Sequence, residues 1–385
     1  MIPPEKIIYL DNNATTQLDP AVVEEMLPFL TTYYGNASSG YGFGAQVRDA
    51  IERARERVAA LIGCTPAEIV FTSGGTESNN AAINSALQSE PRGRHIVTSA
   101  VEHSATYRHC EMLTHQGAEV TFIKVDADGN LDFEQLEQSI RPETAIISIM
   151  WANNETGVLF PVQQIAGFAR RNRVPFHSDA VQAAGKLPVR LPEIGASSSS
   201  ISAHKLHGPK GVGALYISRR SGFTPTIIGG DQENSRRAGT ENVAGIVGFG
   251  KAAELATAAW AAYDTRVRAM RDRFEQALLA AIPGVVVNGG AAPRLPNTSS
   301  ISFPGVESEA VLMLLDRQNL CCSAGSACLT GSREGSHVLR AMNASDERVR
   351  GSLRFSWSRL STVAETSAAI DLVVRAITKL RAMAS

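Results

Sequence analysis

Short apolar stretches alternate with amphipathic stretches of helical period over the first two thirds of the chain. Strand-like stretches lie at 68–72, 95–98, 119–125, 145–150, 175–177, 197–202 and 212–217, and helix-like stretches at 44–61, from about 79, 107–115, 133–140 and 162–171. Strands that alternate with helices in this way form a mostly parallel sheet with helices on both faces. The pattern therefore predicts an α/β fold for this part of the chain.

The pattern changes after a long alanine-rich helical stretch. That stretch covers 244–281, and beyond it 285–287 and 298–303 alternate as strands do, whereas 309–317 and 365–383 have helical period. We therefore expect a large domain at 15–255 and a smaller α+β domain formed by 1–14 and 256–385.

The charged residues are nearly balanced, with 37 Lys and Arg against 38 Asp and Glu. A chain without a basic excess has no electrostatic reason to bind nucleic acid or an anionic membrane. The most apolar long stretch, 243–263, contains Lys251 and Glu254, and the first residues lack the apolar core of a signal peptide. The sequence therefore predicts a cytoplasmic protein with no membrane span.

The five cysteines are scattered and include no C-x-x-C pair. This is typical of a reducing compartment, and it favours neither a disulfide framework nor a metal site. Cys328 differs from Cys64 and Cys110 because it lies in a stretch rich in small residues, 323–332, whereas structural cysteines are normally buried. We expect Cys328 to be a nucleophile and interpret the other two as structural.

Polar side chains follow the ends of the predicted strands. His103, Asn154, Asp179, Gln182 and Lys205 all lie at or just after such an end. The carboxyl ends of parallel strands are where open α/β sheets bind ligands. We therefore expect these five side chains at one ligand site.

Lys205 lies between a strand-like stretch, 197–202, and a turn rich in Gly and Pro, 207–211. Burial at such a place lowers the pKa of a lysine, and the resulting amine forms Schiff bases, including with pyridoxal phosphate. An ordinary lysine between a strand and a turn has the same local pattern.

A second signal for a phosphate-bearing ligand lies at 73–78, where a strand ends in Gly-Gly before a helix. That arrangement binds phosphate, although ordinary strand–helix turns share it.

Several motifs, in the same order along the chain, resemble those of one enzyme family. They are DNNATT at 11–16, FTSGGTES at 71–78, NNETG at 153–157, HKLHGPKG at 204–211, RRAGTEN at 236–242, GSAC at 325–328 and SHVLRAM at 336–342. The family is the cysteine desulfurases, pyridoxal-phosphate enzymes of the class-V aminotransferase family, and the resemblance is strongest to the nitrogen-fixation and housekeeping branch, NifS and IscS. It covers nearly the whole chain and implies the type I fold of pyridoxal-phosphate-dependent transferases.

The resemblance also implies roles around the cofactor. It makes Lys205 the lysine of the Schiff base, Asp179 the partner of the pyridinium nitrogen and Gln182 the donor to the ring hydroxyl. His103 is expected to stack on the ring and relay protons. The further cofactor-binding residues that it implies are Gly75, Thr76, Asn154, Ser202, His204 and Thr240. Thr240 resembles a residue that reaches the phosphate from a second subunit, which implies a homodimer.

For the substrate, the resemblance implies that Arg354 binds the carboxylate of L-cysteine, with Asn154 and Asn13 beside it. A planar guanidinium suits a carboxylate because it can donate two parallel hydrogen bonds. The implied reaction converts L-cysteine to L-alanine and leaves a persulfide on Cys328. The sulfur then passes to an iron–sulfur scaffold, which includes nitrogenase assembly, or to another acceptor protein.

Two departures and two alternatives accompany this interpretation. Ala37 stands where the family usually has proline and Ala324 where it usually has serine, and neither change removes reacting groups. A selenocysteine lyase-like β-elimination is an alternative on the same fold, because selenide leaves without a thiol nucleophile. A non-catalytic scaffold for iron–sulfur assembly is the other, although a scaffold has no use for Lys205 or Cys328.

Overall fold

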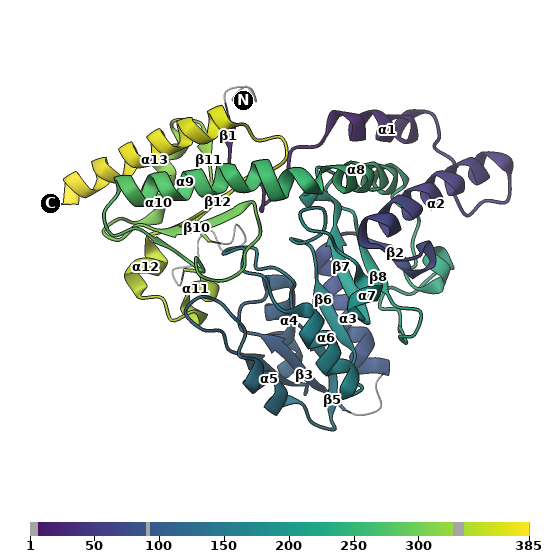
Figure 1. The fold of residues 1–385 in the computed structure, drawn as a ribbon. Coiled ribbons are helices and arrows are strands. Elements are labelled where there is room, and N and C mark those ends of the chain that lie inside the picture. Colours follow the sequence, from purple (N-terminus) through teal and green to yellow (C-terminus); the bar gives the residue numbers. More distant parts are fainter. Residues whose placement is uncertain (1–6, 90–92, 326–334, 385) are drawn as a thin grey trace.

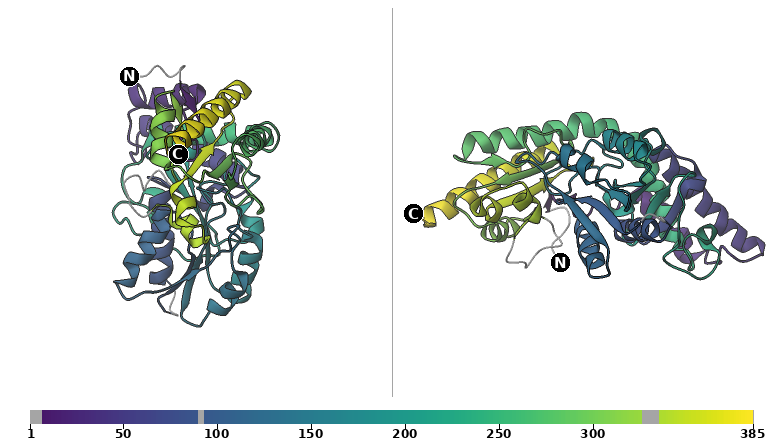
Figure 2. Two further views of the ribbon diagram at one scale, coloured as in Figure 1. Left: turned by 90° about the vertical axis from the view of Figure 1, so that its left-hand side faces the viewer. Right: turned by 90° about the horizontal axis from the view of Figure 1, so that it is seen from below.

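The computed structural model describes residues 7–89, 93–325 and 335–384. It consists of two sheet-containing parts that are joined along one side by a long helical run (Figure 1). The right-hand view of Figure 2 shows the same run from below, crossing from one part to the other. The candidate site residues lie where these two parts meet, as described below.

The larger part is built on a seven-stranded sheet. In sheet order its strands are β2 (Ile69–Thr72), β8 (Gly213–Ile217), β7 (Ser198–Ser202), β6 (Phe176–Asp179), β5 (Thr144–Ser148), β3 (His95–Ser99) and β4 (Glu119–Ile123). Only β8 runs antiparallel to its neighbours. The predicted α/β fold with a mostly parallel sheet is therefore confirmed.

Helices cover both faces of this sheet. Ile96 packs with α3 (Gly75–Ser89) and α4 (Ser104–Thr114), whereas the next residue, Val97, packs in a different cluster with α5 (Phe133–Ser139) and α6 (Val162–Arg171). Successive side chains of a strand point to opposite faces, so a strand that is covered on both sides tends to have a near-continuous apolar run. The remaining covering helices are α1 (Pro20–Thr31), α2 (Gly42–Ile62), α7 (Leu191–Ile194) and α8 (Val243–Ala262).

The smaller part has an antiparallel sheet with strand order β12 (Ser352–Ser356), β10 (Thr298–Ser302) and β9 (Val286–Val287). Its other elements are β1 (Ile8–Tyr9), which pairs with β11 (Leu320–Cys321), and helices α9 (Arg268–Ala281), α10 (Ser308–Asp316), α11 (His337–Ala341), α12 (Asp346–Arg350) and α13 (Val363–Ala384). Phe274 lies at the centre of its core, with ring centroids 4.8 Å from Phe355 and 5.1 Å from Trp357.

Three predicted helices differ from those observed. The helix expected from about residue 79 begins at Gly75, and the one expected from 107 begins at Ser104, because the side chain of His103 caps it. The single helix expected over 244–281 is interrupted by a π-helical turn, Tyr263–Val267, between α8 and α9. Tyr263 and Val267 both enter the core of the smaller part, so the helical run changes core at this turn. The domain boundary at 255/256 stays a proposal.

No helix in the described part of the chain is long and apolar enough to cross a membrane. Nor do the described residues contain a group of three or more His, Cys, Asp or Glu side chains that could hold a metal ion.

A buried ion pair ties α2 to the sheet. The carboxylate of Glu233 accepts hydrogen bonds from Arg55 Nη1 and Nη2 at 2.6 and 2.8 Å and from the backbone N–H of Phe71 in β2 at 2.8 Å. Glu233 belongs to the short 3-10 turn Gln232–Ser235 and has a left-handed φ of 49°. The pair therefore anchors the strained segment that leads into the loop of Thr240.

We predict that Glu233→Gln lowers the free energy of unfolding by about 3 kcal/mol, because among the described residues it leaves the buried Arg55 charge with the exposed Glu52 as its one carboxylate partner. Urea denaturation at one protein concentration measures this change. The control is Glu307→Gln, which breaks the exposed pair with Arg350 and should cost less than about 1 kcal/mol. Equal costs for the two variants would contradict the prediction.

Candidate active site

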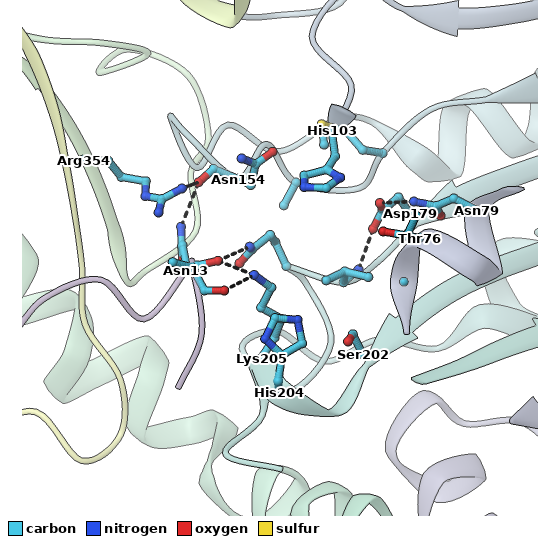
Figure 3. A pocket seen from close by; sticks show the side chains of 16 residues that line it. Asn13, Thr76, Asn79, His103, Asn154, Asp179, Ser202, His204, Lys205 and Arg354 are labelled. Atoms are coloured by element: carbon cyan, nitrogen blue, oxygen red, sulfur yellow. Dashed lines mark hydrogen bonds between the residues drawn. The ribbon is translucent and has the colours of Figure 1, made fainter. Parts of the chain in front are cut away.

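A cavity of about 240 Å³ lies at the carboxyl ends of β3, β5, β6 and β7 and reaches the smaller part (Figure 3). All five side chains that were expected at one site line it. The complete lining is Asn13, Ala14, Gly75, Thr76, Asn79, His103, Met150, Ala152, Asn154, Asp179, Val181, Gln182, Ser202, His204, Lys205 and Arg354. Strand ends supply most of these residues, whereas Arg354 comes from β12 and Asn13 from the turn after β1.

Asp179 is the only carboxylate among the described residues of the lining, and it is buried. One carboxylate oxygen accepts from Asn79 Nδ2 at 2.6 Å and the other from the backbone N–H of Val181 at 2.9 Å. Asn79 Oδ1 in turn lies 3.1 Å from His177 Nε2. Burial lowers the pKa of His177 to about 3, so this neutral imidazole donates to Asn79 and sets the orientation of its amide.

His103 is the N-cap of α4. Its Nδ1 accepts from the backbone N–H of Ala105 at 3.1 Å, so the proton of the neutral imidazole resides on Nε2. Burial lowers the pKa of His103, the charges of Lys205 and Arg354 act in the same direction, and Asp179 opposes them. A pKa below the ordinary 6.5 leaves the ring neutral at pH 7. His103 can therefore present one N–H donor, Nε2, to a ligand.

Lys205 ends the 3-10 turn that follows β7. Its Nζ donates to the backbone carbonyls of Asn13 at 2.5 Å and Ala14 at 2.7 Å. Beside it, His204 Nδ1 lies 3.2 Å from Thr15 Oγ1. Burial, followed by the charge of Lys205, lowers the pKa of His204 to about 3, so this imidazole is also neutral. The turn after β1 thus forms a cradle of oxygen acceptors for the lysine amine.

Arg354 is buried on β12 and faces the cavity. It donates from Nη1 to the backbone carbonyl of Asn154 at 3.0 Å and from Nη2 to Asp11 Oδ1 at 2.7 Å. Its Nε has no hydrogen-bond partner among the described atoms. A buried guanidinium in the lining of a cavity favours an anionic ligand there.

The N-terminus of α3 forms another wall of the cavity. The first N–H groups of a helix have no partner within the helix and attract anions. A Cβ added to Gly75 would lie 2.8 Å from Val181 Cγ2, so the absence of a side chain lets this helix end approach the strand ends. Thr76 beside it and Ser202 across the cavity add hydroxyl groups. This wall has the chemistry of a phosphate site.

These groups fit pyridoxal phosphate, the cofactor implied by the resemblance. The cofactor needs an amine for its aldehyde, a carboxylate for its ring nitrogen and donors for its phosphate. Lys205, Asp179 and the N-terminus of α3 are the corresponding groups of the cavity. Arg354, which also lines the cavity, suits a further anion.

Two expected residues lie elsewhere. Thr240 is exposed and is absent from the described lining of the cavity. Cys328 lies outside the described residues, between Gly325 and Gly335.

Sequence reasoning missed Asn79, Asp11 and Lys186, which contact the expected site residues directly. A helix that begins at Gly75 brings Asn79 to the same face one turn later, so the correct helix start would have indicated it. Lys186 follows Gln182 by four positions within a series of tight turns, and it donates to that side chain. Asp11 lies 343 positions from Arg354, and no local pattern indicates their pairing.

The family model of class-V aminotransferases matches residues 8–368. Curated relatives named cysteine desulfurase include one from Trichormus azollae, 49% identical over 377 residues, which cover 98% of this chain and 94% of the relative. Another, from Gluconacetobacter diazotrophicus, is 50% identical over 378 residues with the same coverage of 98% and 94%.

Solved structures agree with these relatives. A NifS-like protein superposes with a TM-score of 0.90 at 34% identity and covers 97% of this chain and 100% of its own. The structure titled SspA in complex with cysteine has a TM-score of 0.80 at 34% identity, and the match covers 90% of this chain and 98% of that one.

The geometry around His103 makes a prediction for the protein without cofactor. NMR of histidine labelled with ¹⁵N should show the Nε2–H tautomer and a midpoint below 6.5, because burial favours the neutral ring and Ala105 occupies Nδ1. The variant His103→Gln identifies the signal. An Nδ1–H tautomer, or a midpoint above 6.5, would contradict the assignment.

Proposed function

We propose that this chain, which belongs to the cysteine desulfurases of the class-V aminotransferase family, removes the sulfur of L-cysteine with the help of pyridoxal phosphate and releases L-alanine. One observation carries the proposal: Lys205, Asp179 and Arg354 line the same cavity. An amine, a carboxylate and a buried guanidinium together match the aldehyde and ring nitrogen of the cofactor and the carboxylate of an amino acid.

Bound pyridoxal phosphate supplies an electron sink for the electrons released at Cα of an amino acid. Arg354 binds the substrate carboxylate, because its side chain lines the cavity and a planar guanidinium can donate two parallel hydrogen bonds. Asp179, held by two hydrogen bonds, would pair with the ring nitrogen and favour its protonated form. Lys205 removes the proton from Cα, because Nδ1 of His103 is occupied and its Nε2 carries a proton. His103 therefore acts as a proton donor in this scheme.

Sulfur transfer requires a second nucleophile, for which we propose Cys328. Its thiolate attacks the sulfur of the substrate and forms a new S–S bond, while the Cβ–S bond breaks. Cβ keeps the electron pair of that bond and takes up a proton, so the products are L-alanine and a persulfide on Cys328. Cys64 is unsuited to this role, since burial raises the pKa of its thiol to about 12.

Other features are proposed on the basis of the family resemblance. The protein is a cytoplasmic homodimer in which Thr240 reaches the phosphate in the neighbouring site, and its exposure in a single chain is compatible with that role. Arg237 pairs with Glu77 at 3.0 Å and so connects the loop of Thr240 to the first turn of α3. The sulfur acceptor is an iron–sulfur scaffold protein, in nitrogenase assembly or in general iron–sulfur assembly.

We predict that Cys328→Ala retains the visible absorbance of the bound cofactor but forms no alanine from L-cysteine above background. The measurement is alanine release in the presence of a reductant, and Cys64→Ala is the control that should turn over normally. Alanine formation by Cys328→Ala at the parental rate would refute the persulfide route and favour a selenocysteine lyase-like elimination.

We predict that Lys205→Ala loses the absorbance band of the cofactor–lysine linkage and at least about a thousandfold of its activity, because it removes both the attachment amine and the base. Lys210→Ala, which removes an exposed lysine of the same segment, is the control and should keep the band. A band that persists in Lys205→Ala would mean that another lysine binds the cofactor. A parent protein that cannot take up the cofactor would favour the scaffold alternative.

A further inference from the structure

Lys186 is a second lysine amine behind the site, and none of the sequence motifs indicated it. Its side chain is only 2% exposed. Nζ donates to Gln182 Oε1 at 2.6 Å and lies 3.3 Å from Asn13 Oδ1. Both acceptors are neutral amide oxygens, and within the described ranges no carboxylate forms an ion pair with Lys186. An amine buried without a counter-ion destabilises the fold unless another requirement retains it.

The position of Lys186 is set by tight packing. Gly185, just before it, has a left-handed φ of 73°, and a Cβ at this residue would lie 2.5 Å from Leu206 Cδ2. Leu206 directly follows Lys205, so the two lysine-bearing segments pack against each other without space for adjustment. Burial, with smaller contributions from Lys205 and Arg354, lowers the pKa of Lys186 well below its ordinary value.

The hydrogen bond from Lys186 determines which way the Gln182 amide points. A glutamine amide can exchange its oxygen and nitrogen by rotation, and only its neighbours choose between the two. Because Lys186 donates to Oε1, Nε2 must point the other way, where it donates to the backbone carbonyl of Asn13 at 3.0 Å. The same carbonyl accepts from Lys205 Nζ at 2.5 Å. Gln182 Nε2 and Lys205 Nζ are therefore neighbours at one oxygen.

We propose that Lys186 is a positioning residue that orients Gln182, so that the second N–H of Nε2 faces the phenolic oxygen of the cofactor beside its linkage to Lys205. The inference rests on the proposed function in one respect, that Lys205 is the attachment lysine. In pyridoxal phosphate the phenolic oxygen is on the ring carbon next to the one that bears the aldehyde. A group adjacent to Lys205 Nζ is therefore adjacent to that oxygen, and Asn13 uses only one of the two N–H groups of Nε2.

Lys186 lowers the pKa of the linkage between the cofactor and Lys205 in two ways, through the orientation of Gln182 and through its own charge. A donor to the phenolic oxygen weakens the hold of that oxygen on the proton of the linkage nitrogen. Any positive charge on Lys186 also disfavours the protonated form of the linkage. We therefore expect Lys186→Met to raise the pH at which the visible band of the linkage titrates by about one unit.

The experiment compares pH titrations of the absorbance of the holoenzyme in the parent, Lys186→Met, Gln182→Leu and the double variant. If Lys186 acts through Gln182, each single variant raises the midpoint and the double variant adds little to either, because residues that act as one unit are not additive. Lys251→Met, on α8 and paired with Glu254, is the control and should titrate like the parent.

Thermal unfolding of the same proteins separates positioning from packing. A variant Lys186→Met that binds cofactor, unfolds at a lower temperature and titrates at the parental pH would overturn the proposal, as would additive shifts in the double variant. If Lys186→Met does not fold, the titration of Gln182→Leu tests the proposal alone. A pH midpoint in Gln182→Leu equal to that of the parent would also overturn the proposal. Failure of this proposal can be told apart from failure of the proposed function. If Lys205 were not the attachment lysine, the parent would show no visible linkage band that Lys205→Ala removes.

Discussion

The site depends on one short turn of chain that lies between the two sheets. Asn13, just after β1, accepts from Lys205 and Gln182 with its backbone carbonyl, and its side chain donates to Thr298 of β10 at 2.8 Å. Its backbone N–H donates to Ser356 of β12 at 2.9 Å. One asparagine therefore connects the amine of the larger part to two strands of the smaller part. Such a buried network is stable only when all its members are satisfied, so the relative placement of the two parts and the position of the amine are coupled.

The lining of the cavity is richer in basic than in acidic side chains. Lys205 and Arg354 line it, whereas Asp179 is the only carboxylate in its described lining and Asp11 pairs with Arg354 from outside that lining. Burial keeps His103 and His204 neutral and so prevents a further excess of positive charge. A ligand with a phosphate and a carboxylate suits this lining. Binding of such a ligand to the folded state alone would also stabilise the fold.

The sequence predicted the sheet and its ligand-binding edge because both depend on local patterns. Apolar runs such as 145–150 indicate a strand covered on both faces, and polar residues after several of them indicate the edge. The role of Arg354 came only from motif resemblance. Contacts such as Arg354 with Asp11 remained hidden, because they join side chains 343 positions apart through a hydrogen bond that no periodicity encodes. The π turn at Tyr263–Val267 was missed for a related reason, since its cause is the change from one core to another.

The capping of α4 bears on the division of acid and base roles. An N-cap residue normally offers an oxygen to the first free N–H groups of its helix, and here His103 offers Nδ1 to Ala105 instead. This bond orients the ring and determines its tautomer in one step. A serine cap would satisfy Ala105 equally well but would provide no second group for the cavity. The histidine thus links a structural need of the helix to a proton at Nε2, and the amine of Lys205 is left as the group that can accept a proton from Cα.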